Sequence, residues 1–370
     1  MKILFAGGGT AGHINPALAV AGYIKEKHKD AEIFYVGTAN KLESRLVPEK
    51  GYAFYTIDVA GFSRSLSPKG IVKNVSAVKK AVRASMDCKK LLKEINPDVV
   101  IGTGGYVSGP VLKTAQKMGF KTGIHEQNAF PGVTTKMLAS GADVVMLAMP
   151  EAKKYLNLKR EPVITGNPIR TELLKVTKEE ARQKLGFDDR PMILSFGGSL
   201  GAEKVNLAVG ELINWHNGTG KFYHIHATGK SGYEDMLAKF KNTEIAKEIQ
   251  IREYINDMDI CMAAADLVIC RAGAITLGEL QACSKPAILI PSPNVAENHQ
   301  FHNAMTLKRA GAAELLEEKD LSGEALISKV EMLIENKPKL SLMGANAKKS
   351  AIIDANERIY KEIMKLYTNA

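Results

Sequence analysis

Residues 267–280 read LVICRAGAITLGEL, and they contain the three parts from which the rest of the fold can be predicted. The first four residues form a short apolar run typical of a buried strand. A tight turn follows at Arg271 to Gly273, and a helix is predicted from Ala274. A glycine turn between a strand and a helix directs free backbone N–H groups and the positive end of the helix dipole at one point. Such a point suits a phosphate group, although the same pattern also describes an ordinary strand-to-helix turn.

Glu279 lies inside this predicted helix, roughly one and a half turns from its start. A carboxylate next to a phosphate is unfavourable unless hydroxyl groups donate hydrogen bonds to it, and a ribose offers such hydroxyls. We therefore predict a nucleoside-diphosphate site at this helix, with the ordinary turn as the alternative.

Similar glycine loops follow three other predicted strands. They are GGGTAG at 7–12, GTGGYVSGP at 102–110 and GGSLGA at 197–202. Strands and helices alternate along the chain, which favours parallel sheets with helical crossovers. The pattern restarts after Gly166-Asn167-Pro168, so the 370 residues are expected to form two similar α/β halves. Two halves that faced each other would place these loops on both walls of one cleft.

The first loop also matches the GxGxxG pattern of dinucleotide-binding folds. In those folds an acidic residue at the end of the second strand holds a ribose, but here the strand at 32–36 continues into Gly37 and Thr38. NAD is therefore not expected. A helix is predicted at 16–28, with Pro16 in its first turn. His13 stands between loop and helix, where an imidazole could act as a general base, although a lone histidine is more often structural.

Polar residues follow the predicted strand at 122–124. They are His125, Glu126, Gln127 and Asn128, and the carboxyl ends of parallel strands form the crevice where α/β sheets bind ligands. Asp257 and Asp259 form a DxD pattern that could hold a metal beside a diphosphate. A helix cap at Asp257 explains the pattern more simply.

The composition favours an acidic partner, because Lys and Arg exceed Asp and Glu by a net charge of +10. Nucleic acid, anionic lipid and phosphorylated substrates all satisfy this condition. The cysteines show no metal-ligand spacing and are typical of a reduced cytosolic protein. No apolar run approaches the ~20 residues that a membrane-spanning helix needs.

Residues 63–93 are rich in Lys and Arg and contain a single acid, Asp87. Apolar residues recur among these cations at helical spacing, at Ile71, Val75, Val78 and Val82. This pattern suits a helix on an anionic membrane surface. The spacing by itself favours a helix whose apolar stripe faces the core. Nucleic acid is a third alternative, but no aromatic residues lie among the cations to stack on bases.

Taken together, the motifs resemble the MurG family. The matching segments are GGGTAGH (7–13), GTGGYVSGP (102–110), HEQN (125–128), GNPIR (166–170), GGSLGA (197–202), CRAGAITLGE (270–279) and NHQ (298–300). The resemblance implies an α/β GT-B glycosyltransferase fold, with two Rossmann-like domains whose parallel sheets face each other across a cleft. It implies an acceptor- and membrane-associated domain at 1–165, a UDP-GlcNAc-binding domain at 166–340, and a C-terminal helix within 341–370 that packs back on the first domain.

The resemblance also implies a reaction. N-acetylglucosamine passes, with inversion, from UDP-GlcNAc to the C4 hydroxyl of the N-acetylmuramoyl unit of lipid I (undecaprenyl-diphosphate-MurNAc-pentapeptide), which gives lipid II of peptidoglycan. No cofactor, metal or nucleic acid is implied. The protein is expected at the cytoplasmic face of the cell membrane as a peripheral protein, and this raises the membrane-surface interpretation of residues 63–93 above the core interpretation. The alternatives are another membrane-associated GT-B glycolipid glycosyltransferase, or a UDP-sugar epimerase.

Site residues follow from the resemblance by position. The donor UDP-GlcNAc would be bound by Thr10, Ala11, Gly12, Asn128, Arg170, Ser199, Ile255, Ala274, Ile275, Thr276, Leu277, Gly278, Glu279 and Gln300. Glu279 would hold the ribose, in agreement with the interpretation of its helix above. The acceptor diphosphate would lie against Gly9, Gly104, Gly105 and Tyr106. The sequence departs from the family pattern at Ala11, where a glycine is common, and at Ala272 and Gly278, where polar residues are frequent.

An inverting transfer implies a single displacement without an enzyme nucleophile, so the protein needs a base for the acceptor hydroxyl. His13 is the first candidate. Glu126 is the second, with orientation of His13 as its alternative role. Helix N-termini at Ser199 and Gly273, together with Arg170, would stabilise the leaving UDP without a metal.

Overall fold

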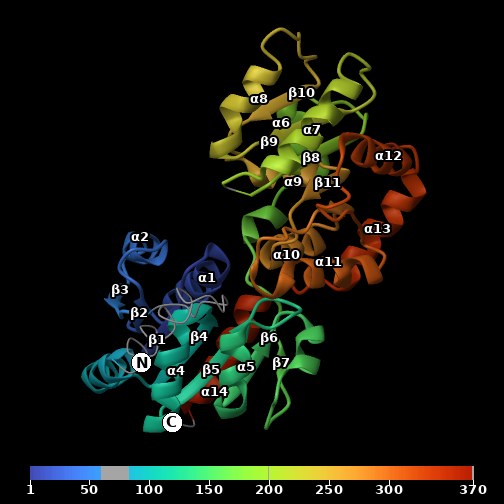
Figure 1. The fold of residues 1–370 in the computed structure, drawn as a ribbon. Helices are drawn as coiled ribbons and strands as arrows, with labels where there is room; N and C mark the ends of the chain where they lie inside the picture. The colour runs from blue at the N-terminus through green and yellow to red at the C-terminus, as the bar shows by residue number, and fades with distance from the viewer. Residues whose placement is uncertain (60–82, 199, 369–370) are drawn as a thin grey trace. The chain divides into compact units, whose positions relative to one another are not determined.

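The computed structural model describes residues 1–59, 83–198 and 200–368 (Figure 1). Most of the basic segment at 63–93 and the predicted donor residue Ser199 lie outside these ranges. The chain divides into two compact units, Met1–Pro168 with Asp354–Ala370, and Ile169–Ile353. Each unit contains one parallel sheet with helices, which confirms the predicted α/β class.

The sheet of the first unit has the strand order β3-β2-β1-β4-β5-β6-β7, and every neighbouring pair is parallel. Its strands are β1 Lys2–Gly7, β2 Glu32–Gly37, β3 Ala53–Thr56, β4 Val99–Gly104, β5 Lys121–Glu126, β6 Val144–Leu147 and β7 Val163–Ile164. The order places the ends of β1, β4 and β5 next to each other. The glycine loops after β1 and β4 and the polar residues at the end of β5, which runs two residues beyond the predicted strand, are therefore neighbours in space.

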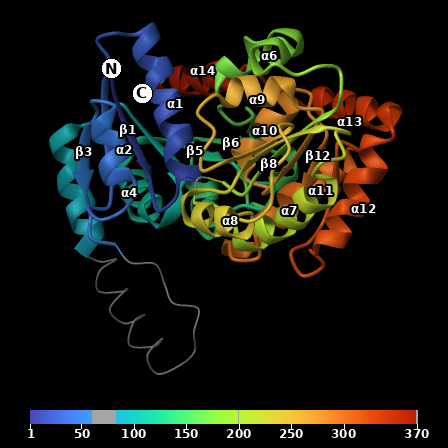
Figure 2. The same ribbon diagram turned by 90° about the horizontal axis from the view of Figure 1, so that it is seen from above.

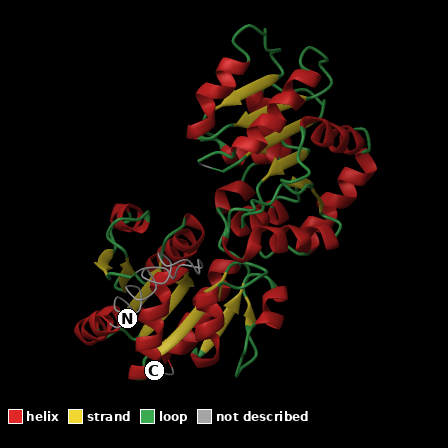
Figure 3. Cartoon of the chain, viewed as in Figure 1, coloured by secondary structure: helices red, strands yellow, loops and turns green. Residues whose placement is uncertain are grey.

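Helices cover both faces of this sheet (Figure 3). They are α1 Ala11–Lys27, α2 Glu43–Glu49, the helix at 83–95, α4 Gly105–Met118, α5 Val133–Leu138 and α14 Ala355–Thr368, with short 3-10 helices η1 Ala139–Gly141 and η2 Pro150–Tyr155. Alternate residues of β1 enter different cores. Ile3 and Phe5 pack in the cluster that includes α1 and α14, whereas Leu4 and Ala6 pack in the cluster that includes α4. Burial on both faces explains the continuous apolar run of this strand.

α1 starts at Ala11, five residues before the predicted start. The amides of His13 and Ile14 donate to the carbonyl oxygen of Thr10 at 3.1 and 3.3 Å, so the end of the glycine loop already forms the first helical turn. Pro16 therefore lies inside the helix and not in its first turn. Its ring nitrogen has no hydrogen to donate to the carbonyl group of Gly12, which weakens the helix where the loop joins it.

The helix at 83–95 covers the C-terminal end of the basic segment. Its residues Cys88, Leu92 and Ile95 are buried in the core, and its lysines, such as Lys89 and Lys93, are exposed. In this part of the segment the apolar side chains face the core. Ile71, Val75, Val78 and Val82 lie outside the described residues. No helix within the described ranges combines the length and apolar composition needed to cross a bilayer.

The second unit has a sheet of order β10-β9-β8-β11-β12-β13, again with parallel pairs throughout. Its strands are β8 Met192–Phe196, β9 Tyr223–Ala227, β10 Ile249–Arg252, β11 Leu267–Cys270, β12 Ala287–Leu289 and β13 Ala313–Leu315. Its helices are α6 Lys178–Leu185, α7 Glu203–His216, α8 Tyr233–Lys239, α9 Met258–Ala264, α10 Ala274–Ala282, α11 His299–Arg309, α12 Gly323–Ile334 and α13 Lys337–Lys349, with 3-10 helices η3 Thr171–Leu174, η4 Lys230–Gly232 and η5 Ala296–Asn298. The predicted strand-turn-helix at 267–280 is β11 and α10.

The C-terminal region forms two helices where the sequence indicated one. α13 contacts α10 and α12 in the second unit, whereas α14 lies beside α1 in the first (Figure 2). Ile359, Ile363 and Leu366 of α14 enter the α1 core, and the hydroxyl of Tyr360 lies 2.7 Å from His28 Nε2. The units therefore change at Pro168 and at Asp354, close to the predicted division at 165/166 but later than 341.

Ile363→Ala is expected to lower the stability of the first unit by about 2–5 kcal/mol, because Ile363 is fully buried among α1 side chains. Lys361→Ala, an exposed change in the same helix, should have little effect. Calorimetry of the whole chain tests this. The transition assigned to the first unit should shift and that of the second unit should stay. A shift of the second transition alone would contradict the packing of α14.

Candidate functional site

The two glycine loops of the first unit pack against each other through their backbones. Gly105 has φ +77°, and a Cβ atom there would lie 2.3 Å from the carbonyl oxygen of Gly8. Gly104 has φ +108°, and a Cβ atom there would lie 2.7 Å from Nδ1 of His13. Gly105 is therefore required by close approach to a backbone as well as by its left-handed conformation, whereas at Gly104 the left-handed backbone is the main requirement, because the nearest atoms belong to the His13 side chain. The contact seats the His13 ring directly over the loop after β4.

His13 lies in the first turn of α1 and is partly exposed. Its carbonyl oxygen accepts a hydrogen bond from Thr103 Oγ1 at 2.7 Å, and its ring Nδ1 lies 3.2 Å from Oε1 of Gln127. The ends of β1, β4 and β5 thus converge on this one side chain. The sequence singled out His13, whereas Gln127 was only one of four polar residues after a strand.

Glu126, the second candidate for the base, makes its hydrogen bonds in the loop from β5 to α5. It is 3% exposed and accepts four hydrogen bonds, from the backbone and side-chain amides of Asn128 at 3.1 Å each, from the Gly132 amide at 3.2 Å and from Thr135 Oγ1 at 2.6 Å. The carboxylate therefore fixes the loop that leads from β5 to α5. The side chain that contacts His13 is Gln127. Asn128, a predicted donor-binding residue, directs its amide at Glu126.

A second buried carboxylate, Glu43, is hydrogen-bonded to the backbone of the first glycine loop. It is 0% exposed and accepts hydrogen bonds from the amides of Gly9 at 3.1 Å and Thr38 at 3.2 Å, and from Thr38 Oγ1 at 2.7 Å. The Gly104 amide donates to Ser108 Oγ at 3.1 Å. Two amides that were predicted for the acceptor diphosphate, those of Gly9 and Gly104, thus have partners within the chain. The predicted positions Gly105 and Tyr106 form the N-terminus of α4.

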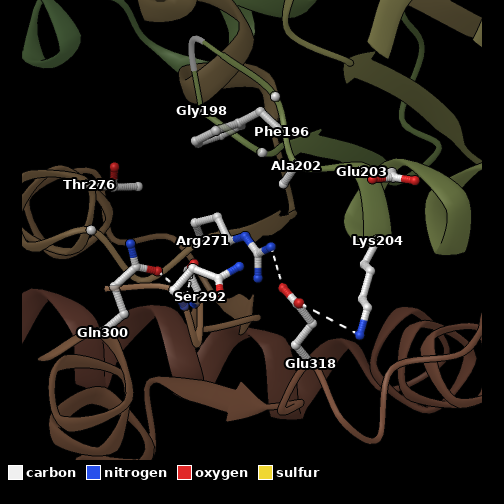
Figure 4. Close-up of a pocket in the computed structure, with 14 residues that line it drawn as sticks. Phe196, Gly198, Ala202, Glu203, Lys204, Arg271, Thr276, Ser292, Gln300 and Glu318 are labelled. Atoms are coloured by element: carbon white, nitrogen blue, oxygen red, sulfur yellow. Dashed lines mark hydrogen bonds and ion pairs between the residues drawn. The ribbon is translucent and has the colours of Figure 1, made fainter. Parts of the chain in front are cut away.

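The second unit has a pocket of about 550 Å³ at the carboxyl ends of its strands (Figure 4). The loop after β8 lines it with Gly197, Gly198 and Gly201, and the start of α10 lines it with Gly273 and Thr276. The free amides at the N-terminus of α10 favour an anion. Gly273 is the N-cap residue of that helix, as the sequence predicted.

Charged and polar side chains face this pocket. Arg271 pairs with Glu318 and donates to the carbonyl oxygens of Ile290 and Pro291 at 3.2 and 3.3 Å, and Lys204 lies 3.8 Å from Glu318 (Figure 4). Glu318 thus faces two cations, and because Glu203 also lines the pocket, the charged side chains there balance and the α10 N-terminus supplies the attraction for an anion. The sequence analysis did not single out Lys204, although it lies just beyond the GGSLGA loop, or Glu318, which is far from the glycine motifs along the chain.

Other predicted donor residues occupy different positions. Gln300 lines the pocket, and its Oε1 accepts the Ser292 amide at 2.9 Å. Leu277 is fully buried, and Ile255 is 4% exposed. The Leu277 side chain points into the core, so only its backbone is suited to a ligand contact. Asp257 precedes α9 as expected for a cap, but its side chain pairs with Arg252 at 2.8 Å.

Arg170 and Glu279 form a two-point ion pair. Arg170 Nε lies 2.7 Å from Glu279 Oε1, and Nη2 lies 3.0 Å from Oε2. Glu279 is 5% exposed, and its hydrogen bonds raise the pKa of the half-buried Arg170 guanidinium. The structure therefore brings together two residues predicted for the donor, in a bidentate geometry that holds both in fixed orientation.

Comparison with known proteins defines the class of this molecule. Residues 3–147 match the glycosyltransferase family 28 N-terminal domain, and residues 192–359 match the glycosyltransferase family 28 C-terminal domain. A solved structure with a similar fold is Acinetobacter baumannii MurG, with a TM-score of 0.81 and 28% identity over 98% of this chain and 99% of that one. With its two parallel-sheet domains, the chain has the fold of a GT-B glycosyltransferase.

A curated relative shows to which family of glycosyltransferases the chain belongs. The UDP-N-acetylglucosamine--N-acetylmuramyl-(pentapeptide) pyrophosphoryl-undecaprenol N-acetylglucosamine transferase of Acetivibrio thermocellus is 49% identical over 99% of both chains. The chain belongs to the MurG family of glycosyltransferases. A UDP-GlcNAc 2-epimerase from Neisseria meningitidis shares the fold alone, with a TM-score of 0.63 and 14% identity over 99% of this chain and 100% of that one.

Gly105→Ala is expected to destabilise the first unit by roughly 1–3 kcal/mol and to displace His13, because the new methyl group meets the Gly8 carbonyl. Gly119→Ala is the matched control. Gly119 has φ +83° but open space around it, so it measures the backbone effect alone. Urea unfolding of both variants tests the difference. Equal stabilities would show that the loops can separate without cost.

Proposed function

We propose that this chain transfers N-acetylglucosamine from UDP-GlcNAc to the C4 hydroxyl of the N-acetylmuramoyl unit of lipid I, which forms lipid II. The observation that carries this proposal is the end-to-end identity of 49% with a transferase named for these substrates. The likeness to an epimerase is limited to the fold. Neither the epimerase reaction nor another glycolipid acceptor is favoured.

In the reaction we infer, the acceptor oxygen attacks the anomeric carbon of the sugar while the bond to UDP breaks. The hydroxyl proton passes to Nε2 of His13. The partly exposed ring at converging strand ends supports this role. Glu126 is a weaker candidate because its carboxylate is buried and accepts four hydrogen bonds within the protein.

For the donor we propose the pocket of the second unit. The N-terminus of α10 and the cations Arg271 and Lys204 would hold the diphosphate and stabilise the UDP leaving group. Thr276 and Gln300 line the same pocket. Each oxygen of the Glu279 carboxylate has lone pairs that the hydrogen bonds from Arg170 do not use. These lone pairs would accept hydrogen bonds from the ribose hydroxyls. Thr10, Ala11, Gly12 and Ile255 remain proposed donor contacts.

For the acceptor we propose the N-terminus of α4, at Gly105 and Tyr106, as the diphosphate site. We also propose a peripheral position at the cytoplasmic face of the cell membrane, with residues 63–93 on the anionic surface. Two features support it. The proposed acceptor is anchored in lipid, and the helix at 83–95 exposes Lys89, Lys90 and Lys93.

His13→Ala is expected to lower kcat for transfer to a short-chain lipid I analogue by roughly 10²–10⁴-fold, the usual contribution of a general base, with KM for UDP-GlcNAc little changed. Glu279→Ala should instead raise KM for UDP-GlcNAc. The control is His28→Ala, a histidine at the other end of α1. Radiolabelled sugar transfer is the measurement. A parent protein that UDP-GlcNAc stabilises against heat but that transfers nothing would contradict the proposed acceptor.

Replacing Lys89, Lys90 and Lys93 by Gln should weaken binding to phosphatidylglycerol vesicles at least about tenfold, because each cation near the surface contributes on the order of 1 kcal/mol. Vesicle sedimentation measures this.

The matched control replaces Lys337, Lys348 and Lys349, which are exposed on α13. These changes remove the same charge and should leave binding closer to that of the parent. An equal loss of vesicle binding in both triple variants would show that binding depends on net charge alone. It would contradict a specific membrane-binding surface at 63–93.

A further inference from the structure

We propose that Gln127 and His125 are positioning residues that fix the tautomer of His13, so that Nε2 is the ring atom left free to accept the acceptor's proton. The inference deepens the proposed function, because it rests on His13 as the base. It follows from a chain of hydrogen bonds in which each donor and acceptor can be assigned from the partner that it faces.

The chain begins at the buried ring of His125, which is 2% exposed. Its Nε2 lies 3.0 Å from the carbonyl oxygen of Gly166. A carbonyl oxygen only accepts, so Nε2 carries the hydrogen. Burial lowers the pKa of His125, which favours the neutral ring. Its Nδ1 is then an acceptor.

Gln127 is the second member, and its amide orientation is fixed by two contacts. Nε2 of Gln127 lies 2.9 Å from the carbonyl oxygen of His125 and 3.0 Å from His125 Nδ1. Both partners are acceptors, so the NH₂ end of the amide must face them. The Asn167 side chain donates to the Gln127 carbonyl oxygen at 3.0 Å and holds its backbone. With Gln127 only 2% exposed, the amide has a single supported orientation.

The third member is His13. The remaining amide atom, Gln127 Oε1, carries no hydrogen and lies 3.2 Å from His13 Nδ1. His13 Nδ1 must therefore donate, and the lone pair of the neutral ring is at Nε2. When Nε2 takes up a proton, the Nδ1–H bond to Gln127 stays in place. The same contact orients the ring before and after proton transfer.

The strand geometry explains why this function falls to alternate residues of the HEQN segment. Side chains two apart in extended chain share one face, so His125 at the end of β5 and Gln127, the residue directly after the strand, lie on the same side and contact each other. Glu126 points to the other side and holds the loop to α5, as described above. The chain of contacts thus follows from the register of one strand, and it excludes the carboxylate from His13.

Gln127→Met tests the inference, because methionine is close in size but offers no amide. We expect kcat to fall about tenfold or more, within the roughly 10²–10⁴-fold that a base contributes, with KM for UDP-GlcNAc unchanged. In the His13→Ala background the same substitution should cause no further fall. Gln116→Met is the matched control. Gln116 donates to the Leu138 carbonyl at 3.1 Å and is not part of the hydrogen-bond chain from His125 to His13. Its replacement should leave kcat as in the parent.

Gln127→Glu guards against a variant that simply folds poorly. Burial and the acceptor atoms of His125 favour the neutral carboxyl at this position, with its O–H toward His125 Nδ1 and its other oxygen toward His13 Nδ1. This variant should therefore retain at least about tenfold more kcat than Gln127→Met, because the base keeps its orienting acceptor. Equal kcat for the two variants would overturn the proposal.

A full-sized fall caused by Gln127→Met in the His13→Ala background would also overturn it, because the role would then be structural. If Gln127→Met matches the parent while His13→Ala is inactive, the positioning role is wrong and the proposed base stands. If His13→Ala keeps its kcat, the proposed base is wrong and the positioning role falls with it.

Discussion

The contact between the backbones of Gly8 and Gly105 is the constraint on which the first unit's site depends. The Gly8 carbonyl occupies the space where any other residue at 105 would place its Cβ atom. This approach brings the loop after β1 onto the loop after β4 and sets His13 above Gly104. The Thr103 bond to the His13 carbonyl and the Glu43 bond to the Gly9 amide then hold the two loops in this arrangement. The glycines are thus required for packing between the two loops, whether or not a phosphate binds there.

In the second unit, the glycine loop after β8 is likewise held by a close backbone contact, here with the loop after β9. Gly201 has φ +88°, and a Cβ atom there would lie 2.3 Å from the Thr228 carbonyl oxygen. A Cβ atom at Gly229 would lie 2.2 Å from the Gly201 amide nitrogen. The loop after β9 therefore supports the loop that lines the pocket, and the Ser231 hydroxyl adds a bond to the Leu200 carbonyl at 2.5 Å. The sequence Gly229-Lys230-Ser231 resembles the end of a P-loop, but here it is a support for the glycine loop.

Much of the architecture could be predicted because buried parallel strands and glycine turns leave strong local patterns. The exceptions have physical causes. β3 and β13 are short edge strands with partly exposed residues, so they lack the continuous apolar run of the central strands. The break between α13 and α14 contains neither glycine nor proline to mark it. The residues of the candidate site were harder to predict from the sequence than the strands and helices. Glu43, Gln127 and Lys204 act through partners that are distant along the chain, and sequence spacing does not show which side chains the fold brings together.

The protonation of the His13 ring is the most direct test of this account. The measurement is a long-range ¹H–¹⁵N correlation spectrum of the histidine-labelled protein, with His13→Ala used to assign the signals. The account predicts that the neutral ring carries its hydrogen on Nδ1 and has its lone pair on Nε2. A neutral ring with its hydrogen on Nε2 would contradict the account, because the atom proposed to accept the proton would already carry one.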